Sequence, residues 1–208
     1  MRDSILAVSG ELDFARPEAS PVHGFEVNTL VRPGNKQVKN WEKEETYRSV
    51  YVPVIRNVVN RWWETFDFPE PSETHGARAV TTVAPQALFF MNDQFVMQHA
   101  GVAAERVMAK GSTDAERVQL AYRQTLSRDP NEKELARALE YVAAVRNGYS
   151  AEAQPATAEE EAPAKNKRAR GKRRRAAAAS EPKGSAEQEA WTRLYQALIE
   201  SAEFRYRG

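Results

Sequence analysis

The sequence predicts a mainly α-helical protein: an irregular helical domain with at most a minor β element and a long disordered insertion before its last helix. Three observations support this fold class. Apolar side chains repeat at helical spacing in most segments, capping motifs precede two of these segments, and one stretch near the C-terminus is almost devoid of apolar residues. A chain of 208 residues is long enough for one domain with a hydrophobic core plus such an insertion.

The N-terminal third has the least regular pattern. Residues 2–13 (RDSILAVSGELD) predict a short helix, whereas proline and glycine interrupt residues 20–37 and predict a loop. Residues 47–54 (YRSVYVPV) alternate loosely and are rich in β-branched and aromatic side chains, which predicts a short strand or an extended piece. Residues 55–68 return to helical spacing, through Val58, Val59, Trp62, Trp63 and Phe66.

The run of five apolar residues at 87–91 allows two interpretations, a ligand-binding site or a corner of the hydrophobic core. Thr82 is suited to cap a helix, and Pro85 is suited to its first turn, where the missing N–H costs nothing. Asn92 and Asp93 then predict the end of that helix and the cap of a second one over residues 94–109. This arrangement of a helix, a sharp corner and a longer helix favours the hydrophobic core over a ligand-binding site.

Two capping motifs predict the next helices. Thr113 and Glu116 precede apolar residues at positions 118, 122 and 126, and Asn131 and Glu134 precede apolar residues at positions 135, 139 and 142. In this motif the first side chain accepts a hydrogen bond from the backbone three residues later, and the carboxylate bonds back to the first residue. Both helices are therefore expected to begin at these motifs.

The composition changes abruptly after Asn147. Residues 148–188 contain no Leu, Ile, Val, Phe, Met or Trp, so they cannot bury enough surface to offset the entropy of ordering. Helical spacing resumes through Trp191, Leu194, Tyr195 and Leu198. We therefore expect a main body over residues 1–148, a disordered Ala/Glu/Lys/Arg-rich linker over 149–186, and a terminal helix, 187–208, that docks back onto the body.

The composition also bears on the chemistry available to the chain. The absence of cysteine excludes disulfides, thiol catalysis, iron–sulfur clusters and cysteine zinc sites. Three histidines, His23, His75 and His99, are far apart and belong to no metal-binding motif, so neither a metal nor a cofactor is expected. The sequence has no export signal and no apolar window approaching the roughly 18 residues of a membrane span.

A basic tract at residues 165–175 holds eight Lys or Arg and is of the kind that binds phosphate backbones. It lacks the aromatic side chains that stack on bases, and three glutamates, 159–161, precede it. The formal charge of the chain is only +1. Nucleic-acid binding through this tract is therefore an alternative to a solvated spacer, and the spacer is favoured.

The loop FDFPEPSETHGAR, residues 66–78, gathers chemistry-bearing side chains. Asp67 with Glu70 or Glu73 is a carboxylate pair of the type used in acid–base catalysis, and His75 lies among them. The other interpretation is an extended connection pinned by Asp67 to Arg48, Arg56 or Arg78, because a guanidinium holds a carboxylate with two hydrogen bonds. Trp62 and Trp63 point about 100° apart on a helix, so they cannot both face one narrow seam; one is expected in the core, and the other is open to a sugar or a partner, with core packing the favoured interpretation.

Taken together, four segments resemble planctomycete-specific domain one, a domain of unknown function. They are YRSVYVPVIRN, FDFPEPSETHGARAVTTVAPQALFFMNDQFVMQHA, LSRDPNEKELARAL and AWTRLYQALIESAEFRY. The resemblance spans most of the chain except residues 149–186, and its most specific element is the Thr-Thr-x-x-Pro-Gln-Ala-Leu run. Its recurrent positions are Arg48, Tyr51, Arg56, Asp67, Arg78, Thr82, Pro85, Gln86, Asn92 and Phe95.

This resemblance implies a context and no particular reaction. Such domains follow another domain of unknown function, often with a cytochrome-c-like segment further upstream, in exported proteins. It therefore implies a C-terminal fragment or truncated reading frame whose parent is periplasmic or extracellular. Haem cannot be assigned to this cysteine-free piece.

The functional expectation is a noncatalytic binding or assembly module whose partners are the upstream domains of its parent. One alternative is part of an extracellular polymer-acting hydrolase whose site lies between this domain and an upstream one; a second is nucleic-acid binding through the basic tract. Buried polar side chains must be hydrogen-bonded, so the recurrent polar residues suit a scaffold network as well as a site. The candidate binding or polar network is Arg48, Tyr51, Arg56, Asp67, His75, Arg78, Thr82, Gln86 and Asn92.

Overall fold

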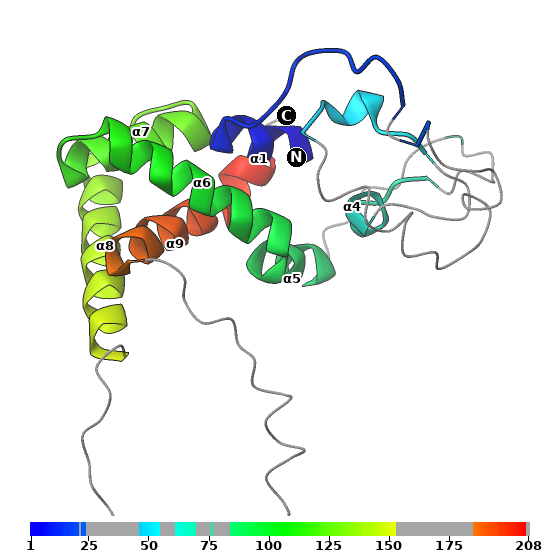
Figure 1. Cartoon of the computed structure of the whole chain (residues 1–208). Coiled ribbons are helices and arrows are strands. Elements are labelled where there is room, and N and C mark those ends of the chain that lie inside the picture. The colour runs from blue at the N-terminus through cyan, green and yellow to red at the C-terminus, as the bar shows by residue number, and fades with distance from the viewer. Residues whose placement is uncertain are drawn as a thin grey trace, which may run out of the picture.

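The computed structural model describes residues 1–20, 22–23, 46–54, 61–69, 76, 84–152 and 185–206. Within these ranges the protein is mainly helical and has no β-strand, so the predicted fold class is confirmed (Figure 1). The minor β element is a single isolated bridge between Asp13 and Tyr47. None of the described helices has the length and apolarity needed to cross a membrane.

Helix α1 (Arg2–Ser9) begins the fold and buries Ile5 and Leu6 completely. It ends at Gly10, whose φ of 77° lies in the left-handed region that glycine adopts without strain. A Cβ at this position would also collide with the guanidinium of Arg106. A short helix is therefore confirmed, but it ends at Ser9, whereas the sequence predicted a helix over residues 2–13; the left-handed conformation of Gly10 ends it.

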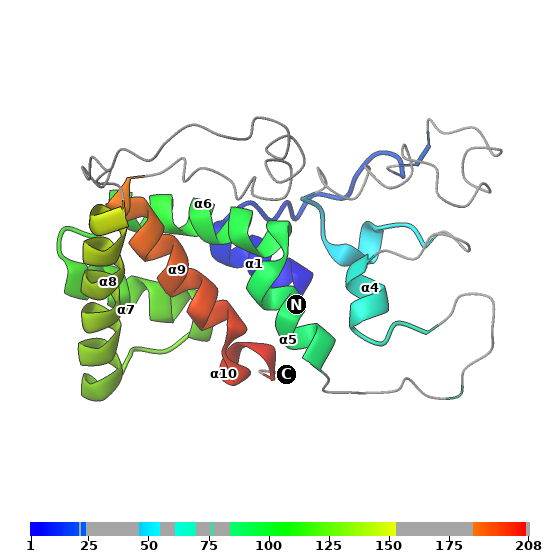
Figure 2. The same cartoon turned by 90° about the horizontal axis from the view of Figure 1, so that it is seen from below.

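The segment expected as a short strand or extended piece contains a 3-10 turn, η2 (Ser49–Tyr51), with extended residues on either side of it. We call residues 46–54 the strap; they start beside the N-terminal end of α1 and continue toward α4 (Figure 2). Helix α4 (Arg61–Thr65) falls within the predicted helical segment 55–68, whose first six residues lie outside the described residues.

Helix α5 (Ala84–Asn92) and helix α6 (Gln94–Lys110) form the predicted helix–corner–helix. Asp93 caps α6, since its carboxylate accepts a hydrogen bond from the Phe95 backbone N–H at 2.9 Å. Phe90 and Val96 are buried on the two sides of the corner. Within the apolar run 87–91, Phe89 and Phe90 belong to the core, whereas Leu88 and Met91 are more than half exposed, so the predicted core position is confirmed only in part. Thr82, the expected cap of the first helix, lies outside the described residues.

Helix α7 (Asp114–Leu126) and helix α8 (Glu132–Glu152) begin at the predicted capping motifs. The Thr113 hydroxyl accepts from the Glu116 N–H at 3.2 Å, and the Glu116 carboxylate accepts from the Thr113 N–H at 3.3 Å. Asn131 and Glu134 form the equivalent pair at the start of α8, at 2.9 and 2.8 Å. Helix α8 continues through Glu152, and residues 153–184 lie outside the described part of the chain.

Helix α9 (Ala186–Glu200) lies against both α6 and α8 and is followed by the short helix α10 (Ala202–Arg205). Both views show α9 between these helices, with α5 near its C-terminal end (Figures 1 and 2). Its apolar face belongs to the same core as the buried residues of α6, α7 and α8. The buried apolar residues of α9 and α10 are Ala190, Trp191, Leu194, Tyr195, Leu198, Ile199 and Phe204.

Candidate functional site

Asp67 and Gln86, two of the candidate residues, meet where α4 turns toward α5. The backbone closes this turn with hydrogen bonds from Phe66 to Trp62 and from Phe68 to Trp63. Asp67 has a φ of 56°, a left-handed conformation that is uncommon for a residue other than glycine. Its carboxylate accepts a hydrogen bond of 3.4 Å from the buried Gln86 side chain. We call this pair the Asp67–Gln86 corner.

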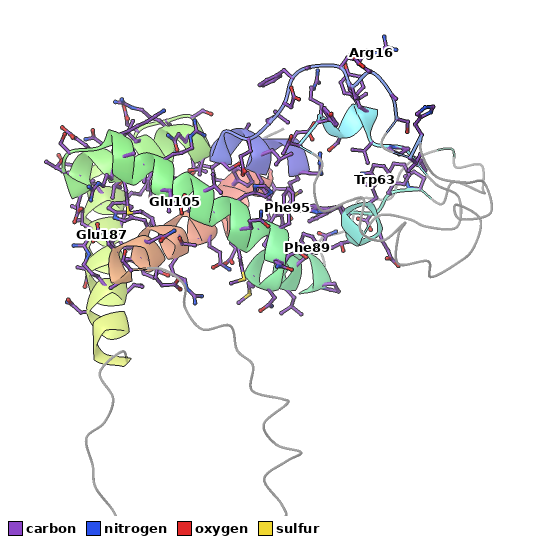
Figure 3. The ribbon with its side chains drawn as sticks, in the orientation of Figure 1. Arg16, Trp63, Phe89, Phe95, Glu105 and Glu187 are labelled. Atoms are coloured by element: carbon purple, nitrogen blue, oxygen red, sulfur yellow. The ribbon has the colours of Figure 1, made fainter. Side chains whose placement is uncertain are left out.

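An aromatic cluster supports this corner. Trp62, only 7% exposed, packs edge-on against Phe89 and Phe95, with ring centroids 4.5 and 5.0 Å away. Phe66 and Phe90 extend the cluster toward α5. Figure 3 shows Phe89 and Phe95 near the corner between α5 and α6, with Trp63 farther out near α4. Such edge-to-face contacts stabilise a pair beyond the area it buries.

The two tryptophans have different environments, as their positions on the helix predict. Trp62 is in the core, so it offers no exposed ring for stacking on a sugar. Trp63 is partly buried and stacks on Phe68, with centroids 4.9 Å apart. The hydrolase alternative therefore loses one of its two aromatic platforms.

A histidine–carboxylate pair lies on the other side of Phe95. His99 Nδ1 is 2.5 Å from the Glu11 carboxylate, and its ring packs edge-on against Phe95 with centroids 4.1 Å apart. The His99 side chain is buried, whereas that of Glu11 is about one-third exposed. Glu11 reaches this position because Gly10 ends α1 and turns the chain toward α6. A histidine held by a carboxylate has a fixed ring orientation.

The first residues of α1 attach the strap. The buried Arg2 donates to the Tyr47 carbonyl at 2.7 Å, and its guanidinium lies 6.0 Å from the Phe95 ring centroid. The Asp3 carboxylate accepts from the Ser49 N–H at 2.8 Å and from the Ser49 hydroxyl at 2.5 Å. A continuous row of polar and aromatic contacts thus joins the strap, α1, α6, α5 and the end of α4.

The structure brings together some of the candidate residues and separates others. Arg48 is exposed and precedes η2, and Tyr51 is partly buried at its end, so both belong to the strap. Asn92 donates back to the Leu88 carbonyl at 3.1 Å within α5 and is exposed. The remaining candidates lie outside the described residues; they are Arg56, His75, Arg78 and Thr82. Glu70 and Glu73 lie outside the described residues as well.

Sequence reasoning missed Arg2, Asp3, Glu11 and the role of His99. Their contacts join positions 45, 46 and 88 residues apart, and no local motif reports such pairs. In the described ranges, no group of three or more possible metal-ligating side chains forms. This row can fix the relative positions of five segments and orient a histidine. Its polar groups are bonded to one another, as a scaffold requires.

Two further ionic clusters join helices of the body. In the first, Glu187 of α9 pairs with Arg117 of α7 at 3.1 Å and with Arg146 of α8 at 2.7 Å. The same carboxylate accepts the Trp191 indole N–H at 2.8 Å, and Asp114 pairs with both arginines. Figure 3 shows Glu187 at the α8 end of α9. This cluster ties three helices together around one carboxylate.

The second ionic cluster centres on Arg128, in the connection between α7 and α8. Its guanidinium binds Glu203 of α10 and Glu134 of α8, with bonds of 2.7–2.8 Å, and lies 5.6 Å from the Tyr122 ring centroid. These two carboxylates raise the pKa of Arg128. In turn, the Arg128 hydrogen bond, together with the Asn131 backbone N–H, lowers the pKa of Glu134 from 4.5 to about 2.

The Glu134 shift predicts an acid-sensitive stability. A carboxyl whose pKa is lower in the folded state contributes stability that is present above the unfolded pKa and lost as pH falls through the folded one. We therefore expect the melting temperature to fall between pH 4.5 and about 2. The contribution should be about 1 kcal/mol, because the partners are partly exposed.

Thermal unfolding followed by circular dichroism across this pH range checks the prediction. Glu134→Gln retains a capping side chain and should flatten the profile, whereas Glu132→Gln, at the exposed first residue of α8, should leave the profile unchanged. Parallel profiles for the native chain and Glu134→Gln would show that the pair does not contribute.

Comparison with known proteins places this architecture in a family. Residues 1–142 match the family model described as PSD1: Protein of unknown function (DUF1553), which confirms the resemblance over that range. The match includes the Asp67–Gln86 corner and the His99–Glu11 pair and ends within α8, so α9 lies beyond it. No curated protein and no solved structure matches the chain. Because the match covers more than half of its 208 residues, the chain belongs to the PSD1 family of proteins of unknown function (DUF1553).

Proposed function

We propose that this chain is a noncatalytic binding or assembly module, the C-terminal part of a larger exported protein, and that it packs against another domain of that protein. The observation that carries the proposal is the exposure of large apolar side chains beside the strap. Phe14 is 74% exposed and Val50 is 71% exposed. Large apolar side chains exposed close together on a folded body are typical of a site that another protein part covers.

These side chains belong to two segments that lie together. The Asp13 N–H donates to the Thr46 carbonyl at 3.0 Å, so the residues around Phe14 run beside the beginning of the strap. Val54, at the end of the strap, is also exposed. We call Phe14, Val50 and Val54 the attachment surface. The strap and α4 lie to one side of the helical body, away from α7 and α8 (Figure 1).

The Asp67–Gln86 corner is on this same side of the body, next to α4. The partly buried Trp63 and Phe68 stack beside it, and aromatic side chains are enriched where proteins meet. We therefore propose that Asp67 and Phe68, at the start of the segment FDFPEPSETHGAR, lie at or near the junction with the partner domain. In this arrangement the row of polar contacts would hold the attachment surface rigidly on the helical body.

The family resemblance supports the rest of the proposal. Domains of this type follow other domains in exported, planctomycete-type proteins, so the partner would be an upstream domain and the compartment periplasmic or extracellular. The role proposed for this chain needs no cofactor. Its contribution would be a preformed surface, which lowers the entropy lost on association.

Binding of an environment-sensitive hydrophobic dye tests this proposal. We expect the isolated chain to enhance dye fluorescence while its far-ultraviolet circular dichroism stays helical, because the attachment surface is exposed on a folded body. The double variant Phe14→Ser, Val50→Ser should lose about half or more of the enhancement, since these are the two most exposed apolar side chains described.

Tyr141→Ser provides the matched control, because Tyr141 is an exposed aromatic residue on α8, at the other end of the body. This variant should retain the dye signal. A compact helical monomer that binds no dye would contradict the proposal, and equal losses in the double variant and the control would contradict the location of the attachment surface.

A further inference from the structure

We infer that helices α5 to α8 form a binding surface for an amphipathic helix, and that residues 185–206 are its tethered ligand. This segment would bind through its own side chains, so it should remain bound after its covalent connection to α8 is cut. The inference concerns the packing of α9 on the body and does not depend on the proposed function.

The apolar face of α9 has the spacing of a helix that docks on a surface. Buried residues recur at positions 191, 194, 195, 198 and 199, the i, i+3, i+4, i+7 and i+8 pattern of docked amphipathic helices. Trp191, Tyr195 and Ile199 are completely buried. On α6 the corresponding core positions are small or β-branched and also completely buried: Val96, Ala100, Ala103, Ala104 and Val107.

Polar contacts to three different helices fix the position of α9 on this surface. Gln196 donates to the Met91 carbonyl of α5 at 2.8 Å, and the Tyr195 hydroxyl donates to Gln124 of α7 at 2.6 Å. Burial raises the pKa of Tyr195, so this hydroxyl keeps its proton. Gln188 donates to Glu105 of α6 at 2.6 Å. Together with Glu187 and its two arginines, these contacts select one register along the surface.

The segment also carries its own helix caps. The Ser185 hydroxyl accepts from the Gln188 N–H at 3.2 Å at the start of α9, and the Ser201 hydroxyl accepts from the Phe204 N–H at 3.2 Å at the start of α10. A side-chain cap satisfies one of the four first N–H groups of a helix without help from preceding residues. Residues 185–206 therefore carry their own caps in the bound conformation.

The family match provides an independent argument. It ends at residue 142, yet the core of the matched region is completed by α9, which follows only after residues 153–184. A long connection between a surface and its ligand mainly sets the effective concentration of the ligand and adds no contact. Recognition should then reside in the side chains of α9 and the surface that they meet.

Site-specific cleavage of the full chain tests this inference. Residues 165–175 are replaced by the recognition sequence of a site-specific protease, and the purified protein is cut. We expect both pieces to elute together in gel filtration at micromolar concentration, which requires a dissociation constant of about 1 µM or lower. Helical circular dichroism should persist, and the melting temperature should become dependent on protein concentration. Separate elution of the pieces, or loss of helical signal on cutting, would overturn the inference.

Exchange of a labelled peptide shows whether side chains determine the binding. A fluorescent peptide of residues 185–206, in molar excess, should enter the cut protein, and uncut protein should take up at least about tenfold less because the tethered copy competes. A Leu194→Asp peptide should fail to enter, since Leu194 is buried, whereas an Ala197→Asp peptide should enter normally because Ala197 is exposed. No uptake by the cut protein, or equal uptake of the two variant peptides, would refute a helix-binding surface.

Discussion

A chain that ends at residue 184 should lose its cooperative thermal transition, the largest effect that we expect from any change to this protein. The truncation removes α9 and α10, whose buried apolar side chains complete the core. Each large apolar side chain contributes about 1.5–3 kcal/mol when buried. Seven apolar residues are lost, and domains have only about 5–15 kcal/mol of net stability. The truncated chain should therefore show reduced helical circular dichroism and a broad, non-cooperative melt.

Deletion of residues 165–175 is the matched control. It removes the basic tract and leaves every residue that the structure describes, so the melting temperature should stay within about 2 °C of that of the native chain. Truncation removes α9 and α10 altogether. Protease cleavage in the connection, by contrast, leaves residues 185–206 in the same solution as the rest of the chain, where they can still bind. A sharp melt in the truncated chain, near the native melting temperature, would show that helices α1 to α8 are sufficient for the fold.

The starts of α6, α7 and α8 were predictable from sequence because their causes are local, whereas the end of α1 was predicted four residues too late. Asp93, Thr113 and Asn131 each accept a backbone hydrogen bond within three residues of themselves, and a reader of the sequence can see both partners. Apolar spacing similarly predicted the buried face of α9. By contrast, the strand or extended piece expected at residues 47–54 contains a 3-10 turn, because Asp3 binds the Ser49 backbone and holds it there.

The candidate site was predictable only in part, since its contacts join distant parts of the chain. Asp67 and Gln86 were both identified as candidates, but neither their hydrogen bond nor the left-handed turn at Asp67 follows from sequence spacing. The pairing of His99 with Glu11 depends on the angle at which Gly10 ends α1. Propensity and periodicity describe single elements, whereas such pairs depend on how two elements pack.

Trp191→Ala should cost about 3–5 kcal/mol, the typical result of removing a completely buried tryptophan. The substitution leaves a cavity between α9 and its neighbours, and it removes the indole N–H that donates to Glu187 and the ring beside the Arg117 guanidinium. For a domain of this size the melting temperature should fall by about 6–20 °C, measured by thermal denaturation.

Trp191→Phe should cost less than Trp191→Ala, because it keeps an aromatic ring in the core. Its main loss is the hydrogen bond, which contributes about 1.5–3 kcal/mol when the acceptor is charged. Arg193→Ala, two residues away on the exposed face of the same helix, should change stability by about 0.5 kcal/mol or less. If Trp191→Ala and Arg193→Ala had the same melting temperature, α9 would not be the central helix of the core. The binding surface inferred for it would then have no apolar anchor.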